Sequence, residues 1–165
     1  FNWIKQVFLL SLTWLSFKKL LVPETMRSHF KDIARQLIEN KPGNKMNVIF
    51  GGGRDFLGAS IESKIPEAVH FGGGAEKSCN RTDKVNLVEK YLKQFNNETV
   101  AKYVTNTGEL MDALTDVHHL DHVLGLFSNN HLPYNTLRNT ESSGEPSLTE
   151  MTKAAIRVLG KFHWM

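Results

Sequence analysis

A glycine-rich segment that ends in an arginine is the first feature of this sequence that could take part in chemistry. Residues 50–54 read Phe-Gly-Gly-Gly-Arg and end the short apolar run Met46–Phe50. Glycines let the backbone approach a phosphate closely, and the Arg54 guanidinium could pair with phosphate oxygens in bidentate fashion. The spacing matches neither a P-loop nor a dinucleotide-binding pattern. The sequence therefore favours the other interpretation, a tight strand exit that requires a positive φ.

A dense group of histidines is the second candidate. Residues 118–122 read His-His-Leu-Asp-His, and imidazole and carboxylate groups are normal zinc ligands. Because adjacent side chains of a strand point to opposite faces, only His119 with Asp121, or His118 with His122, could converge. Neither pair supplies the three or four ligands of a zinc site. The sequence favours a solvated loop that leads into a buried strand.

The single cysteine and two sequons complete the candidates. A catalytic thiol needs a neighbouring base, and His70 is the nearest histidine in the same loop as Cys79, so we interpret Cys79 as structural or incidental. With one cysteine, no disulfide can form within the chain. Asn80 and Asn97 each begin an Asn-x-Thr sequon and would be glycosylation sites in a secreted protein.

The elements that must position these residues alternate between helix and strand. Apolar side chains at helical spacing predict helices in residues 24–38, 85–95 and 109–114, and a last helix that opens at Ser147 with Glu150 completing a capping box. Short apolar runs predict strands in residues 46–50, 101–105 and 122–127, and a long connection spans residues 54–83. The pattern predicts an α/β fold with a mainly parallel sheet flanked by helices.

Length and charge limit the class of protein. A chain of 165 residues with a net charge of +3 suits one globular domain, and no basic stripe with aromatic residues suggests nucleic-acid binding. The apolar core of residues 1–21 is too short for an ordinary membrane-spanning helix, and no small-residue cleavage site follows it. We expect residues 1–21 to stand outside the fold and residues 22–165 to form a partial domain.

Several motifs occur in the same order as in a known protein family. Residues 30–38 followed by Val-Ile-Phe-Gly-Gly-Gly-Arg at 48–54, then Arg-Thr-Asp at 81–83, resemble segments of the alkaline phosphatase family. Thr-Gly-Glu-Leu-Met at 107–111, Leu-Gly-Leu-Phe at 124–127 and Glu-Pro-Ser-Leu-Thr-Glu-Met-Thr at 145–152 follow in the family's order. The resemblance covers about residues 22–161 and implies a middle portion of the alkaline phosphatase α/β sandwich.

The resemblance also implies a reaction. Members of the family hydrolyse phosphomonoesters with two zinc ions, a magnesium ion and a serine that forms a phosphoserine intermediate. Their Asp-Ser-Ala and Asp-His-Gly-His-His motifs do not occur in this sequence, so we assign no catalytic residue and expect this chain to be inactive alone. By resemblance we also expect an extracellular or cell-surface homodimer, with membrane attachment only through a lipid anchor outside this chain.

A peripheral calcium site is the one family site that can be carried over in part. Glu67, the main-chain carbonyl of Phe127, and Glu145 match its positions, whereas Ser128 stands where the family has an acid. Oxygen ligands suit calcium, and the missing carboxylate predicts weak binding. Three ordinary surface groups are the alternative.

Two other functions stay open. The chain could be a non-enzymatic truncated remnant that binds a partner or misfolds. It could also be a free-standing phosphate- or metal-binding α/β module that uses residues 51–54 or the histidine cluster.

Overall fold

A four-stranded parallel sheet organises the structure. The structure, a computed structural model, describes residues 7–9, 31–59, 81, 83–96 and 98–161. Its strands are β1 (Val7–Leu9), β2 (Val48–Gly51), β3 (Ala101–Val104) and β4 (His122–Leu126), in the spatial order β1-β2-β4-β3. All three pairings are parallel. The predicted α/β class with a parallel sheet is confirmed.

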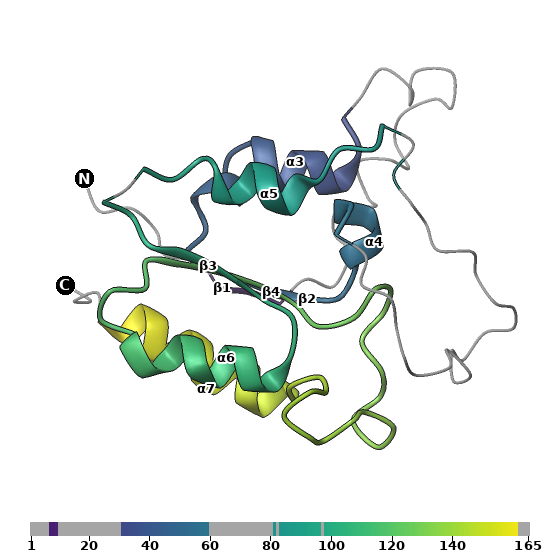
Figure 1. Cartoon of the computed structure of the whole chain (residues 1–165), viewed down its shortest axis with the longest axis vertical. Helices are drawn as coiled ribbons and strands as arrows, with labels where there is room; N and C mark the ends of the chain where they lie inside the picture. Colours follow the sequence, from purple (N-terminus) through teal and green to yellow (C-terminus); the bar gives the residue numbers. More distant parts are fainter. Residues whose placement is uncertain (1–6, 10–30, 60–80, 82, 97, 162–165) are drawn as a thin grey trace, which may run out of the picture.

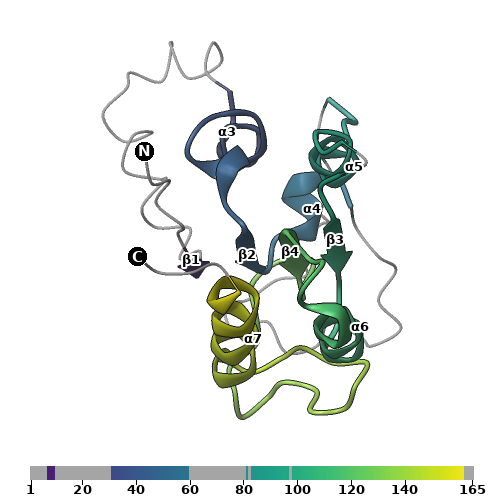
Figure 2. The same ribbon diagram turned by 90° about the vertical axis from the view of Figure 1, so that its left-hand side faces the viewer.

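Helices cover both faces of this sheet, as Figure 1 shows. Helices α3 (Ile33–Glu39), α4 (Arg54–Leu57) and α5 (Leu87–Leu92) lie on one face. Helices α6 (Thr107–Ala113) and α7 (Leu148–Gly160) lie on the other. The turned view in Figure 2 keeps the same two layers, with the sheet between them. Two 3-10 turns, η1 (Gly43–Lys45) and η2 (Leu114–Asp116), end α3 and α6 respectively.

The alternation of side chains along β2 and β4 divides the core in two. Ile49 and Leu124 contribute to the cluster beneath α3 and α5, whereas Val48 and Val123 belong to the cluster beneath α6 and α7. All four side chains are at most 1% exposed. A strand buried on both faces needs apolar residues at successive positions, which explains the continuous apolar runs in the sequence.

Gly125 allows the aromatic residues of the α6–α7 cluster to meet. A Cβ atom at this position would lie 2.4 Å from Cζ of Phe127 and 2.7 Å from Cδ1 of Phe50. The two rings instead pack against each other, with centroids 5.8 Å apart. A glycine at the centre of β4 is therefore a packing requirement.

Polar caps fix where the helices begin. The side chains of Asp32, Asn86, Asn106 and Ser147 each accept a hydrogen bond from the backbone N–H three residues later. At α7 the Glu150 carboxylate also accepts from the Ser147 N–H, at 2.7 Å, so the predicted capping box is confirmed. These caps satisfy backbone donors that a helix cannot satisfy internally.

The observed bounds differ from the predicted ones mainly at element ends. Asn86 starts α5 two residues later than predicted, and Asn106 starts α6 two residues earlier. Arg54–Leu57, predicted as the start of a long connection, forms the short helix α4. The helix predicted over residues 24–38 begins only at Ile33, because Asp32 is its N-cap and has an extended backbone. Residues 10–30 and 60–80 lie outside the described part of the chain.

The amino-terminal segment contributes one described strand. Residues 7–9 pair in parallel with β2, placing Val7 opposite Val48 and Leu9 opposite Phe50. We predicted that residues 1–21 stand outside the fold, and β1 lies within that range. The boundary at residue 22 itself stays a prediction.

Candidate functional site

The carboxyl ends of β2, β4 and β3 meet at one edge of the sheet, and this edge is the candidate site. All three strands are parallel, so the segments that follow them emerge on the same side. Ligands of open α/β sheets bind outside the carboxyl ends of the strands. We call these segments, residues 52–59, 105–109 and 127–130, together with the turn 139–145, the carboxyl edge.

The glycine-rich segment that follows β2 is joined by backbone hydrogen bonds to the segment that follows β4. The N–H groups of Gly53, Arg54 and Asp55 donate to the carbonyls of Asn130, Ser128 and Asn129 at 2.8, 3.1 and 3.1 Å. Gly53 has a φ of +89°, which confirms the predicted tight exit. These three N–H groups are already used, so this part of the loop does not offer them to a phosphate, and the geometry does not favour a phosphate-binding loop.

Arg54 carries the positive charge of the carboxyl edge. Its side chain is half-buried, and Nε is buried without a hydrogen-bond partner among the residues that the structure describes. Burial lowers the pKa of Arg54, whereas the charges or dipoles of Tyr103, Glu145, Asp55 and Glu109 act in the opposite direction. An arginine stays protonated at neutral pH even so. At the carboxyl edge, three carboxylates and a phenol therefore favour the charged form of this guanidinium electrostatically.

Tyr103 brings a second buried polar atom to this group. Within the described part of the chain its hydroxyl has no hydrogen-bond partner, and burial raises the pKa of Tyr103 to about 12. The ring packs with the cluster beneath α3 and α5. An unsatisfied buried hydroxyl costs about 1–3 kcal/mol, so Tyr103 is a position where a polar ligand or water would be stabilising.

The two glutamates near Arg54 are held by backbone and hydroxyl donors. Glu109 accepts hydrogen bonds from the N–H and the hydroxyl of Thr105, at 2.6 and 2.8 Å. Glu145 accepts through Oε2 from the N–H of Asn139, at 3.2 Å. Each carboxylate is thereby oriented at the carboxyl edge and keeps further oxygen lone pairs.

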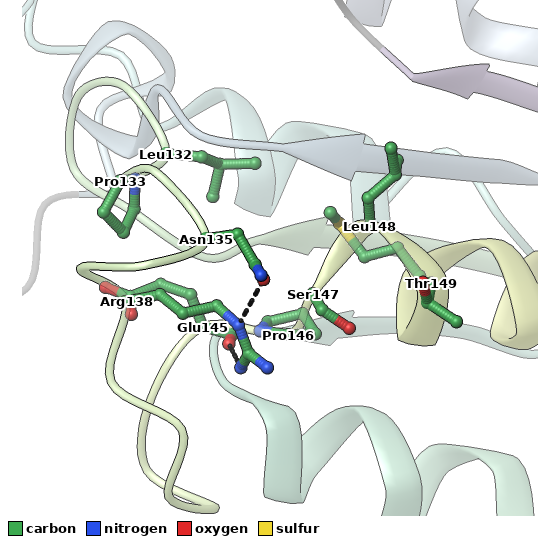
Figure 3. A pocket seen from close by; sticks show the side chains of 10 residues that line it. Leu132, Pro133, Asn135, Arg138, Glu145, Pro146, Ser147, Leu148 and Thr149 are labelled. Atoms are coloured by element: carbon green, nitrogen blue, oxygen red, sulfur yellow. Dashed lines mark hydrogen bonds between the residues drawn. The ribbon is translucent and has the colours of Figure 1, made fainter.

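A pocket of about 320 Å³ opens beside Glu145, between the segment 132–138 and the start of α7 (Figure 3). Arg138 crosses it and donates to Oδ1 of Asn135 and to the main-chain carbonyl of Glu145, both at 3.0 Å. Leu132, Pro146 and Met151 supply apolar walls. The contacts of Arg138 fix the backbone of Glu145, which sets the position of its carboxylate.

Two of the three residues of the predicted calcium-like set, Phe127 and Glu145, lie among the described residues. Phe127 directly follows β4 at the carboxyl edge, and its side chain is 1% exposed in the core. Ser128 is next to it, and its carbonyl accepts a hydrogen bond from the N–H of Arg54 at 3.1 Å. Glu67 lies outside the described residues, as do Cys79, His70 and both sequon asparagines, Asn80 and Asn97.

The histidines do not converge on a common point. His119 pairs through Nδ1 with Asp116 at 2.6 Å on the surface, whereas Asp121 binds the N–H of Val100 and the ammonium of Lys161. His122 has its Nδ1 2.9 Å from the carbonyl of Met46 and stacks on Phe95 with centroids 4.3 Å apart. Burial lowers its pKa. The interpretation as a loop leading into a strand is confirmed over residues 118–122.

Sequence reasoning missed Tyr103 and Glu109 as members of the site. Glu109 was noted only within a family-like motif and Tyr103 only within a predicted strand, and no local pattern connects them with Arg54. The available signal was positional: each follows or lies near the carboxyl end of a predicted parallel strand, and such ends meet at one edge.

A parallel α/β domain with charged and oxygen-bearing groups at the carboxyl ends of its strands belongs to the wide class of open α/β folds. A match to the alkaline phosphatase family extends over residues 14–163, and the chain belongs to that family.

Curated relatives agree with the family match. The chain is 41% identical over 139 residues to Alkaline phosphatase 4 of Drosophila melanogaster, covering 84% of this chain and 22% of the relative. It is 39% identical to an alkaline phosphatase of Gadus morhua, covering 78% and 25%, and 41% identical to the Membrane-bound alkaline phosphatase of Bombyx mori, covering 79% and 22%. The chain thus spans about a quarter of the length of these relatives.

Proposed function

We propose that this chain is part of a phosphomonoester hydrolase of the alkaline phosphatase family. The observation that carries the proposal is the family match over residues 14–163, supported by relatives named alkaline phosphatases. The relatives are about four times longer than the matched segment, so the activity belongs to a protein of that length. We propose that the 165 residues alone do not hydrolyse phosphomonoesters.

Zinc and magnesium belong to this proposal through the family. Within residues 31–59, 81, 83–96 and 98–161, no three His, Cys, Asp or Glu side chains are grouped so that they could hold a metal ion. The described residues do not fit the zinc or magnesium centre of a phosphatase, so the hydrolytic step is not assigned to them. Their contribution is to build the sheet and to fix the segments at its carboxyl edge.

A weak calcium site at the carboxyl edge is the second part of the proposal. Its ligands would be Glu145, the carbonyl of Phe127 and Glu67. The donor chemistry fits a hard cation, since carboxylate and carbonyl oxygens are the ligands calcium prefers. Oε2 of Glu145 accepts a hydrogen bond from the N–H of Asn139, and no residue in the described part of the chain donates to Oε1. Support for the site therefore comes from Phe127 and Glu145, at the same edge.

The cellular setting is proposed from the family. A relative from Bombyx mori is named membrane-bound, which is consistent with a cell-surface protein. Among the described residues, no helix is long and apolar enough to cross a membrane. We propose an extracellular or cell-surface homodimer with glycans on Asn80 and Asn97, whose attachment to a membrane, if any, runs through a lipid anchor.

The proposal is tested by assaying two proteins, the full-length product of the gene and the 165-residue chain. The full-length product of the gene encoding this chain should hydrolyse an aryl phosphate, with activity lost in a chelator and restored by zinc and magnesium. The 165-residue chain, purified and supplied with both metals, should stay at background. A full-length product without metal-dependent hydrolysis would overturn the proposed activity, and metal-dependent turnover by the 165-residue chain would overturn its proposed inactivity.

A further inference from the structure

The solvent-facing side of α7 carries an uncharged row of residues with two exposed aliphatic side chains. We propose that, in the full-length protein, this row is covered by a helix from the polypeptide outside these 165 residues, and that the covering helix presents apolar and acidic side chains. The inference rests on the proposal that the chain is part of a longer alkaline phosphatase. It adds an interaction surface and the chemistry of its partner.

The uncharged row follows one ridge of the helix. It consists of Leu148, Thr152, Ile156 and Gly160, which are four residues apart and exposed, and we call it the outer row. Leu148 is 60% exposed and Ile156 is 64% exposed. Residues four apart lie above one another on a helix, and such ridges are the features by which helices pack against each other. The outer row therefore has the form of a helix-packing surface.

The outer row is separate from the face of α7 that already has its partners. The side chains buried in the α6–α7 cluster are Met151, Ala154, Ala155, Val158 and Leu159. A helix with one buried face normally carries polar or charged residues on the opposite side. Burying Leu148 and Ile156 as well would remove further apolar surface from water, which is favourable. Figure 2 shows α6 beside α7 on the side of β3, and no other described helix of that layer on the side of β1.

Both ends of the outer row suit the close approach of a partner. At the amino end, Leu148 also lines the pocket of Figure 3, so the surface there is hollowed. At the carboxyl end, a Cβ atom at Gly160 would have no neighbour within 4 Å among the residues that the structure describes. A glycine in that position lets another segment approach the backbone closely.

The row beside it gives the charge of the partner. Lys153 and Arg157 are exposed and one turn apart, and neither forms an ion pair within the described part of the chain. Glu150 is the one carboxylate of α7, and it accepts hydrogen bonds from the N–H and the hydroxyl of Ser147, both at 2.7 Å. Carboxylates on the partner, placed beside its apolar residues, would complement these two cations.

A second copy of the chain fits this surface less well than an acidic helix does. Two α7 helices that pack antiparallel along their outer rows place their basic rows on the same side, so Lys153 and Arg157 would face like charges. Polypeptide of the same protein is available instead, because this chain covers only 22% of one relative and 25% of another. The observations therefore favour an intramolecular partner.

Cysteine alkylation tests whether the outer row is covered. Ile156→Cys is introduced into the full-length product of the gene and into the 165-residue chain, and its reaction with a maleimide is followed by mass spectrometry. The reaction should be at least about tenfold slower in the folded full-length protein, because a covered thiol reacts only after local opening. In urea the two rates should agree, which is the control. Thr152→Cys, in the same row, replaces Ile156→Cys if that variant does not fold.

Removal of the two positive charges tests the chemistry of the partner. Lys153→Gln combined with Arg157→Gln should lower the melting temperature of the full-length protein by about 2 °C or more. Lys153→Arg combined with Arg157→Lys keeps both charges and is the matched control, so it should melt within about 1 °C of the unmodified protein. In the 165-residue chain, which lacks the partner, the two double variants should melt alike.

The outcomes distinguish the parts of the inference. Equal alkylation rates in the two folded proteins, or a gene product without polypeptide beyond these residues, would overturn the covered row. Slow alkylation that appears in the 165-residue chain as its concentration rises would show that a second copy covers the row instead. Slow alkylation with equal melting temperatures of the two full-length double variants would show that the partner is not acidic. Neither readout depends on catalysis, so a full-length protein without hydrolysis would overturn the proposed activity and leave this inference standing.

Discussion

Single residues in this structure show how burial acts on polar atoms that have no partner. The hydroxyl of Tyr91 is the clearest case, since the residue is 0% exposed and no described residue forms a hydrogen bond with the hydroxyl. Burial accordingly raises its pKa. The ring itself packs edge-on against Phe95, with centroids 5.0 Å apart. The ring stabilises the core, whereas the hydroxyl opposes that stabilisation.

Tyr91→Phe should therefore leave the fold equally or more stable. The substitution removes an unsatisfied buried hydroxyl and keeps the ring, so the free energy of unfolding should rise by 0 to about 2 kcal/mol. Urea denaturation followed by circular dichroism measures it. Tyr91→Leu is the matched comparison: it also removes the hydroxyl but loses the contact with Phe95, and should lower stability by about 1–3 kcal/mol. A loss above 1 kcal/mol in Tyr91→Phe would show that the hydroxyl has a partner.

A second buried polar atom without a partner among the described residues, Nε of Arg54, lies at the carboxyl edge. This atom belongs to a charged group, so Arg54 also interacts electrostatically with carboxylates such as Glu145.

At the scale of elements, ion pairs join helices that share one face of the sheet. Glu39, at the end of α3, contacts Lys31 at 2.7 Å, Arg35 at 3.3 Å and Lys90 of α5 at 2.6 Å. Its side chain is 9% exposed. The hydrogen bonds from Lys31 and Lys90 lower the pKa of Glu39 to about 2. Arg81 plays a similar part, pairing with Asp32 and Asp83.

This arrangement predicts acid sensitivity with a definite sign. A carboxyl whose pKa is lowered in the folded state contributes stability above its unfolded pKa, near 4.5, and loses it as the pH falls through about 2. Glu39→Gln removes that contribution. Between pH 5 and pH 2 the unmodified chain should lose on the order of 2 kcal/mol more than Glu39→Gln, a figure reduced for the exposed lysine partners.

Urea denaturation at a series of pH values measures the difference. Asp32 and Asp83 keep their own lowered pKa values beside Arg81 in both proteins, so their contribution cancels in the comparison. Parallel stability curves for the two proteins would show that the Glu39 carboxylate does not depend on its three cations.

At the scale of the whole molecule, one sheet supports two cores. Leu87 of α5 and Leu110 of α6 are each 0% exposed and lie in the clusters on opposite faces. Strands β2 and β4 supply side chains to both clusters. Since neither helical layer can leave without exposing the same strands, the described part of the fold should unfold as one cooperative unit.

Leu87→Ala and Leu110→Ala test this cooperativity from opposite faces. Each should lower the free energy of unfolding by about 2–4 kcal/mol, because a fully buried leucine is replaced by a cavity. Each variant should unfold in a single transition, and the unfolding curves from far-ultraviolet circular dichroism and from tyrosine fluorescence should coincide. Met111→Ala, at a 39% exposed position of α6, is the control and should change stability by less than about 1 kcal/mol. Two separate transitions in either leucine variant would contradict a shared core.

Sequence reasoning was most successful where a structure depends on neighbouring residues. The capping box of Ser147 and Glu150, the strand exit at Gly53 and the buried run of β4 were predicted because caps, positive φ and strand burial leave local patterns. The predicted ends erred where a cap lay outside the apolar stripe, as at Asn86 and Asn106. The charges that act on Arg54 were not predicted, because Tyr103, Glu109 and Glu145 are distant from it in the sequence and only the fold brings them into range.

The sequence by itself determined the α/β class, the parallel sheet and the family, because each depends on short patterns and on their order along the chain. The tertiary structure decided the strand order β1-β2-β4-β3, the separate partners of His119 and His122, and the carboxylates that act electrostatically on Arg54. These depend on contacts between segments distant in the sequence. Such contacts form only when the strands assemble into the sheet. Their free energies depend on burial and on distances between charges, which no local sequence pattern contains.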